Sequence, residues 1–441
     1  MRSARALLIA IACALPAISV AQTLPGPLEG LPDRAPAPGI ESDPRPGQPI
    51  VIQAGRLYTQ TKNAEGQWNV PIENGVIVIQ DGKITAVGAS GAVTIPDDAH
   101  RIAAPIVTPG LIDARSVVGL AGWLNYDHDQ DQLESSEPMQ PELRAIDAFN
   151  GREPLIEWIR SFGVTTVHTG HAPGQLISGQ TMIVKTRTGE VDDVVINPWF
   201  GIAATLGDSA LASDRGKSPG TRAKQLAILR QALIDAQTYG EKVAKAEAEG
   251  ESPPKRHLRH EAFLKLLDRE VPLIVNCHRS VDLQNAMRLS REFNFKLILE
   301  GAAEAYDHLD AIRDAQIPVF AHAPMARATG EAENASMTTY AKLVEAGIAC
   351  ALESGYEGYV PKTRVVLYEA AIACAYGASF QDALGGITLS AAQILGIADR
   401  VGSIEVGKDA DVALYDGDPF EYTTHCIGVL IEGAIVSRIV R

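Results

Sequence analysis

The chain has 441 residues, of which 46% are hydrophobic and 21% charged, and its formal net charge is −15 at pH 7. This length accommodates one large domain and a smaller one, and the composition is that of a globular protein. The negative charge argues against nucleic acid or an anionic membrane as a partner. The partners that we expect are a small-molecule substrate or ligand and further copies of the chain, without a membrane-spanning segment.

The first 21 residues have the three parts of a secretory signal. Arg2 and Arg5 form a basic start, residues 6–15 form an apolar stretch, and residues 19–21 are the small residues of a cleavage site. The apolar stretch is too short to span a membrane. We therefore expect an exported, periplasmic protein. The alternatives are a lipid anchor on Cys13 and a fortuitous apolar start.

Short strand patterns occur at both ends of the remaining chain, after a Pro- and Gly-rich stretch at 22–48 that predicts a linker. These patterns cover residues 50–52, 75–80, 83–88, 402–415 and 429–436. Asp81-Gly82 is a strong two-residue hairpin signal between two of them. We predict that residues 49–106 and 402–441 together form one small β-sandwich domain.

Between these ends, over residues 107–401, buried strand patterns alternate with helical ones. The strand patterns cover 164–167, 271–277, 295–299, 317–321 and 348–352, and helical segments include 154–162, 222–248, 261–268 and 340–345. Strands that are apolar on both faces and alternate with helices are typical of a buried parallel sheet. The periodicity fits a TIM-like (β/α)8 barrel and, almost as well, a doubly wound open sheet.

The most specific motif is Ile106-Val107-Thr108-Pro109-Gly110-Leu111-Ile112-Asp113-Ala114-Arg115-Ser116-Val117. It resembles the first barrel strand of the amidohydrolase superfamily, V-x-P-G-x-I-D-x-H-x-H. Residues 81–88 and 402–411 resemble the family's end segments, and residues 141–147 resemble the P-x-L-R-A-I-D segment of its imidazolonepropionase-related members. The resemblance implies a TIM-like barrel with a small domain from both chain ends, and hydrolysis of C–N bonds by metal-bound hydroxide.

Both histidines of that strand motif are replaced, by Arg115 and Val117. Positions i and i+2 of a strand point to the same side, which is why an H-x-H pair can bind one ion. Arginine has five donors and no acceptor, so Arg115 cannot be a ligand, and a valine side chain cannot be one either. The motif therefore predicts the fold and puts the metal chemistry in doubt.

Polar side chains follow the predicted buried strands. They are His168 and His171, then His278, Glu300, His322 and Glu353. Active sites of barrels lie at the carboxyl ends of the strands, so these residues predict a polar mouth over an apolar interior.

The resemblance assigns roles to some of these residues. His278 matches the metal-binding histidine of the family's fifth strand. Glu300 matches the Glu of an E-H-G segment whose His place holds Gly301, and Gly355 stands at the place of the Asp that takes the proton from water. One hypothesis is therefore a hydrolase of amides, cyclic amides or dipeptides with one altered divalent metal site.

In that hypothesis one zinc ion is bound by His278, His168 and Glu300, Glu353 serves as general base, and His322 and Arg115 assist catalysis. The alternative is a metal-free relative in which Arg115 pairs with Glu300 or Glu353, because a buried carboxylate needs a partner. Such a protein would be a small-ligand binding or scaffold protein without activity.

Two features stay open. The acidic segment 126–134 could bind a hard cation through oxygen ligands, although a solvated loop is the usual fate of such a charge run. The four cysteines beyond the signal segment, Cys277, Cys350, Cys374 and Cys426, are widely spaced and could form disulfides or be buried thiols.

Overall fold

The computed structural model describes residue 40 and residues 42–212, 217–358 and 363–441. The predicted signal segment and most of the predicted linker lie outside the described residues. Cys277, Cys350, Cys374 and Cys426 are free thiols in the described part of the chain. No described helix combines the length and apolar character that crossing a membrane requires.

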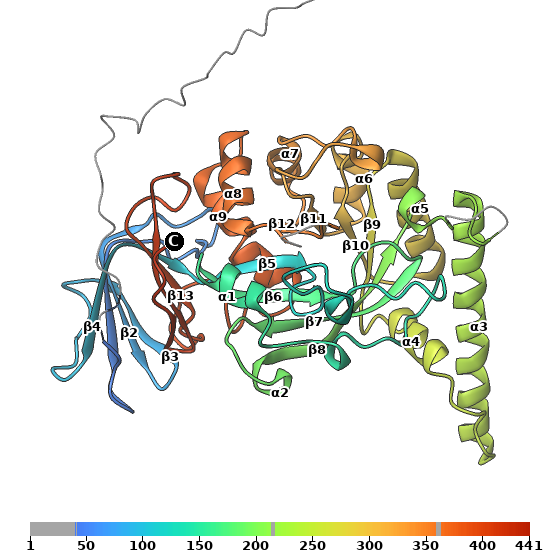
Figure 1. Ribbon diagram of the computed structural model, residues 1–441, viewed down its shortest axis with the longest axis horizontal. Coiled ribbons are helices and arrows are strands. Elements are labelled where there is room, and N and C mark those ends of the chain that lie inside the picture. The colour runs from blue at the N-terminus through green and yellow to red at the C-terminus, as the bar shows by residue number, and fades with distance from the viewer. Residues whose placement is uncertain (1–39, 41, 213–216, 359–362) are drawn as a thin grey trace, which may run out of the picture. The chain divides into compact units, whose positions relative to one another are not determined.

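One sheet is built from both ends of the described chain (Figure 1). In sheet order its strands are β15 (Ala434–Ser437), β14 (Cys426–Ile431), β13 (Val412–Tyr415), β4 (His100–Pro109), β1 (Ile50–Leu57), β2 (Ile72–Gln80) and β3 (Lys83–Ala89). The two ends meet where β13 pairs antiparallel with β4. Asp81 and Gly82 make the predicted hairpin turn, both with positive φ. The small domain made from both chain ends is thus confirmed.

The second sheet has eight strands in chain order and is nearly closed into a barrel. The strands are β5 (Leu111–Ser116), β6 (Val164–Gly170), β7 (Ile177–Lys185), β8 (Val195–Thr205), β9 (Leu273–Cys277), β10 (Leu297–Gly301), β11 (Val319–Ala321) and β12 (Cys350–Leu352). Hydrogen bonds across the remaining gap join the residues after β12 to β5, such as the Gly355 amide to the Arg115 carbonyl at 3.1 Å. The predicted TIM-like barrel is confirmed.

One strand departs from a regular alternation of strands and helices. β7 runs antiparallel to both β6 and β8. Residues 171–176, which connect β6 to β7, are too few for a crossover helix, so the chain returns as a hairpin. The other neighbouring strands of the barrel are parallel.

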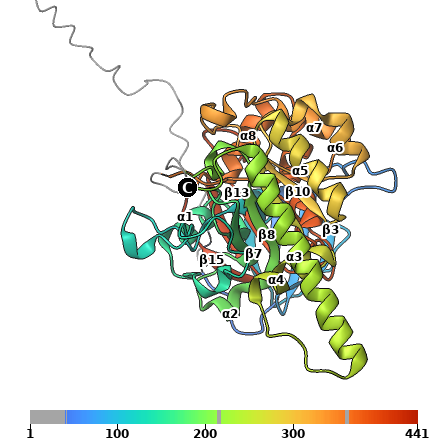
Figure 2. The ribbon, with the colours of Figure 1, turned by 90° about the vertical axis from the view of Figure 1, so that its right-hand side faces the viewer.

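Helices surround the barrel. They are α1 (Pro154–Arg160), α2 (Val191–Val194), α3 (Arg222–Glu249), α4 (Leu258–Leu267), α5 (Ser280–Phe293), α6 (Leu309–Asp314), α7 (Thr339–Glu345), α8 (Val366–Ala375), α9 (Phe380–Gly386) and α10 (Leu389–Ile394). Figure 2 shows the long α3 on the outside of the molecule, next to α4. Thr221 caps the start of α3 by accepting from the Lys224 amide, and Gly250 ends it in the left-handed conformation.

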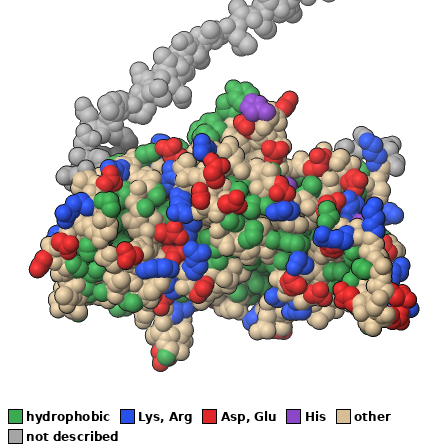
Figure 3. Space-filling view, turned by 90° about the horizontal axis from the view of Figure 1, so that it is seen from below, with side chains coloured by type: hydrophobic (Ala, Val, Ile, Leu, Met, Phe, Trp, Pro, Cys, Tyr) green, Lys and Arg blue, Asp and Glu red, His purple; other side chains and the backbone are tan. Residues whose placement is uncertain are grey.

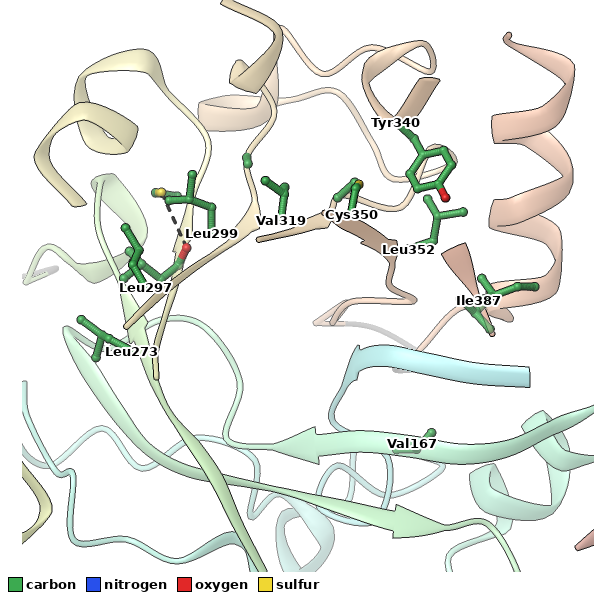
Figure 4. Close-up of a cluster of buried hydrophobic side chains, with 14 of the residues drawn as sticks. Val167, Leu273, Leu297, Leu299, Val319, Tyr340, Cys350, Leu352 and Ile387 are labelled. Atoms are coloured by element: carbon green, nitrogen blue, oxygen red, sulfur yellow. Dashed lines mark hydrogen bonds between the residues drawn. The ribbon is translucent and has the colours of Figure 1, made fainter. Parts of the chain in front are cut away.

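Alternate strand residues fill the two sides of the barrel wall. The outward layer, which packs on the helices, includes Leu273, Leu297, Leu299, Val319, Cys350 and Leu352 (Figure 4). The inward layer includes Ile183, Phe200, Ile274, Ile298, Phe320 and Ala351, with α10 packed against it. The interior is therefore a solid apolar core, and a site is possible only above it, at the carboxyl ends of the strands.

Candidate functional site

The site side chains form the layer directly above the apolar interior. Asn276, Glu300, His322 and Glu353 each follow an inward-facing residue, Ile274, Ile298, Phe320 or Ala351, by two positions. Because side chains of a strand repeat their direction every second residue, these four also face inward. Glu300, His322 and Glu353 are all buried.

Arg115 and Glu300 form a buried ion pair across the barrel. Arg115 Nε donates to Glu300 Oε2 at 3.1 Å, and both side chains are almost completely buried. Arg115 also donates to two backbone carbonyls, that of Ser116 at 2.6 Å and that of His171. Asn276 Nδ2 donates to the second oxygen of Glu300 at 3.2 Å. The guanidinium is thus held inside the barrel by charge and by hydrogen bonds on three sides.

His168 is fixed beside this pair. Its Nδ1 lies 2.6 Å from the Ala114 carbonyl oxygen and its Nε2 lies 2.8 Å from Thr181 Oγ1. Burial and the charge of Arg115 lower the pKa of His168 to about 3, so the ring is neutral. Both ring nitrogens are engaged in hydrogen bonds, which leaves no lone pair free for a ligand in this arrangement.

Glu353 is a buried carboxyl that favours its protonated form. Burial raises its pKa well above the usual value, and the neighbouring charge of Glu300 adds to this, against an opposing effect of Arg115. Its Oε2 is buried without a hydrogen-bond partner in the described part of the chain. Burial and the charge of Glu300 thus favour the protonated carboxyl over the carboxylate.

His278 and His322 are neighbouring neutral imidazoles. Burial lowers the pKa of both, and the proximity of His322 helps to bring the pKa of His278 to about 4. His278 Nδ1 and His322 Nε2 are buried and unpartnered among the described residues. The His278 ring packs on Gly301, where an added Cβ would lie 2.6 Å from its Cε1 atom.

Asp113 and Ser354 close the seam between β5 and β12. The Ser354 amide and hydroxyl both donate to the Asp113 carboxylate, and Ser354 Oγ lies 2.6 Å from Thr363 Oγ1. Burial raises the pKa of Asp113 to about 6, against these hydrogen bonds. These three residues were not predicted from the sequence to belong to the site. Asp113 stands in the strand motif itself, which was the available signal, whereas nothing local identifies Ser354 or Thr363.

The arrangement does not fit the metal site that the family resemblance implies. Both ring nitrogens of His168 and both carboxylate oxygens of Glu300 already have protein partners, and His278 is the predicted ligand with a free ring nitrogen. Within the described ranges, no three His, Cys, Asp or Glu side chains are placed to hold a metal ion. We therefore derive no chemical step through a metal.

Comparisons with known proteins agree with this architecture. A model of the amidohydrolase family matches residues 318–437. The chain is 24% identical to amidohydrolase tasK of Hapsidospora irregularis over 83% of its own length, but spans only 39% of that protein. It is 24% identical to the imidazolonepropionase of Brucella anthropi, covering 83% of this chain and 92% of that one. The crystal structure of an amidohydrolase from Thermotoga maritima superposes with a TM-score of 0.82 at 28% identity, covering 88% of this chain and all of that one.

Proposed function

Because the chain belongs to the amidohydrolase superfamily, we propose that it is an exported hydrolase that cleaves a C–N bond of a small amide, cyclic amide or dipeptide. The reaction takes place at the carboxyl ends of the barrel strands. The Arg115–Glu300 pair stands in place of the ion that relatives use, and the proton transfers fall to side chains of this layer.

The observation that carries this proposal is a set of three buried hydrogen-bonding atoms at the barrel mouth that have no partner among the described residues. They are His278 Nδ1, His322 Nε2 and Glu353 Oε2. Buried polar atoms without a partner destabilise a folded protein, so those that a protein retains are often part of an active site. The ring of His278 and the carboxyl of Glu353 both lie next to Gly301.

The protonation states define the roles. Neutral His278 accepts a proton from water as its oxygen attacks the carbonyl carbon. Protonated Glu353 donates a proton to the leaving nitrogen as the C–N bond breaks, and the imidazolium then returns its proton to the Glu353 carboxylate. His322 acts beside His278, and Arg115 supplies the positive charge that stabilises the oxyanion of the intermediate.

The test is amine release from N-acyl amino acids, cyclic amides and dipeptides by the purified protein, with and without a chelator. We expect turnover that resists the chelator and falls at least about 100-fold in Glu353→Gln and in His278→Gln. His100→Gln, on the small sheet, is the matched control and should keep full activity. Stoichiometric zinc in the protein by elemental analysis, lost in His278→Ala together with activity, would instead support a metal enzyme.

A second candidate function is ligand binding without turnover. It is supported by the hydrogen bonds that hold Arg115 and His168, which make both side chains a fixed part of the core. The same panel decides between the two. Compounds that raise the melting temperature of the chelator-treated protein without any release of amine would favour the binding protein.

Export is part of the proposal and has its own test. The basic start, apolar stretch and small-residue site at 1–21 support it. Mass spectrometry of the protein recovered from the periplasm should show a mature chain that begins at Gln22. A chain that stays in the cytoplasm with residues 1–21 attached would contradict it.

A further inference from the structure

One cavity of the structure has a volume of about 510 Å³. Its wall combines the loop after β5, the start of α1, and residues Ile439 and Arg441 that follow β15. Figures 1 and 2 both show α1 close to the C-terminal end of the chain. The groups assigned to hydrolysis do not line this cavity, so it needs an explanation of its own.

Aromatic side chains form one wall of the cavity. Trp123 and Trp158 meet edge to face, with ring centroids 6.0 Å apart. Trp123 is 38% exposed and Tyr126 is 55% exposed, although both are large apolar residues. Figure 3 shows that hydrophobic side chains also reach the surface elsewhere on the face it presents, among charged ones. What distinguishes the cavity is that its aromatic rings lie together along one open hollow rather than being scattered singly.

The residues that line this cavity include one with a buried carboxylate that has no partner in the described structure. Glu153 is only 3% exposed, and in the described structure neither of its carboxylate oxygens has a hydrogen-bond partner. Burial raises its pKa to about 7, and the charge of Asp129 adds to this. The amides of Gly119 and Gly122 oppose the shift without making a hydrogen bond of good geometry. A carboxyl buried in this way is stabilised when a hydrogen-bond donor enters the cavity.

The charges of the cavity favour a cation. Three carboxylates, of Asp129, Glu153 and Glu157, line it together with one guanidinium, that of Arg441. Arg441 itself lies over the Trp158 ring, 4.9 Å from the centroid, which demonstrates that this ring accepts a positive group on its face. The negative charges exceed the positive one, so the cavity can take a second cation.

We propose that this cavity binds a small organic cation, with its ammonium or guanidinium group on Glu153 and Asp129 and its apolar body against Trp123 and Trp158. A volume of about 510 Å³ is in the usual range for small-molecule sites. A bare metal ion fits less well, because one wall is aromatic and no three acidic, histidine or cysteine side chains of the described residues converge. The acidic segment 126–134 thereby gains a role through its Asp129 and Tyr126.

Isothermal titration of the full chain with 2-phenylethylamine tests the proposal at pH 8, where Glu153 is ionised. 2-Phenylethanol is the neutral compound of matched size. We expect the amine to bind at least tenfold more tightly than the alcohol. Equal affinities, or tighter binding of the anion phenylacetate, would overturn the proposal.

Variants locate the binding. Glu153→Gln and Trp123→Ala should each weaken binding of the amine at least tenfold. Glu190→Gln, an exposed carboxylate elsewhere, should leave it unchanged. His278→Ala should also leave it unchanged, so this result does not depend on whether the barrel hydrolyses anything. If Glu153→Gln fails to fold, Trp123→Ala decides, because Trp123 is half-exposed, and unchanged affinity in that variant would refute the site.

Discussion

Replacing Arg115 with Met tests whether the guanidinium holds the barrel mouth together. The change leaves the Glu300 carboxylate buried, with Asn276 as its remaining side-chain partner and the carboxyl of Glu353 nearby. Removing one partner of a buried ion pair costs about 3–5 kcal/mol, and each backbone carbonyl that loses its donor costs about 1 kcal/mol more. Because Arg115 also donates to two carbonyls, we expect a loss of about 5 kcal/mol or more of the free energy of unfolding.

A double-mutant cycle with Glu300→Leu isolates the pair. Replacing both charges with apolar groups removes the uncompensated carboxylate, so the double variant should regain most of the loss and show a coupling of about 3 kcal/mol. The measurement is urea unfolding followed by far-UV circular dichroism at pH 7. Arg152→Met, which breaks an exposed pair with Glu190, is the control and should be nearly neutral.

Two results would contradict this expectation. A loss below about 1 kcal/mol in Arg115→Met would mean that the pair contributes little at this position. Additive losses in the double variant would mean that Arg115 acts through its backbone contacts and not through Glu300.

Three further outcomes follow. Glu353→Gln mimics the protonated carboxyl, so the free energy of unfolding should change by less than about 1 kcal/mol even where turnover is lost. A large loss of that free energy would indicate that Glu353 is a carboxylate. Gly301→Ala should cost at least about 2 kcal/mol more than Gly355→Ala, because both have positive φ but only Gly301 adjoins the His278 ring; in a His278→Ala background the difference should vanish. The His171 pKa is about 4 in the folded chain, so the free energy of unfolding should fall by about 3 kcal/mol as the pH falls from about 6.5 to about 4. The His171→Asn variant should lack this loss when unfolding is measured across the same pH range. Identical pH profiles for the variant and the unaltered protein would contradict this.

Much of the fold could be predicted from the sequence because it is recorded locally. The strand motif at 106–117, the hairpin at Asp81-Gly82 and the paired end segments each depend on neighbouring residues. The reversed direction of β7 was not predicted, although residues 171–176 are too few for a crossover helix. Strand patterns carry no sign of direction, so only the length of a connection reports it.

The residues of the site could be predicted from the sequence, but the contacts between them could not. The residues that end the strands do gather at the barrel mouth, because the period of two carries the inward direction from Ile298 to Glu300 and from Ala351 to Glu353. Whether Arg115 would pair with Glu300 or Glu353 depends on distances across the barrel, which local patterns do not contain. The same holds for the raised pKa of Glu353, which arises from its burial beside Glu300.

Packing also explains why the family's ligand set cannot be restored one residue at a time. The place that the resemblance gives to a second ligand histidine holds Gly301, whose left-handed backbone and contact with His278 exclude a side chain. A histidine at position 115 would leave Glu300 without its cation. Introducing one ligand histidine alone therefore destabilises the folded protein. Metal binding does not offset this loss, because an ion needs several ligands at once. The Arg115–Glu300 pair and the His278–Gly301 contact thus hold these four residues together as one packed unit.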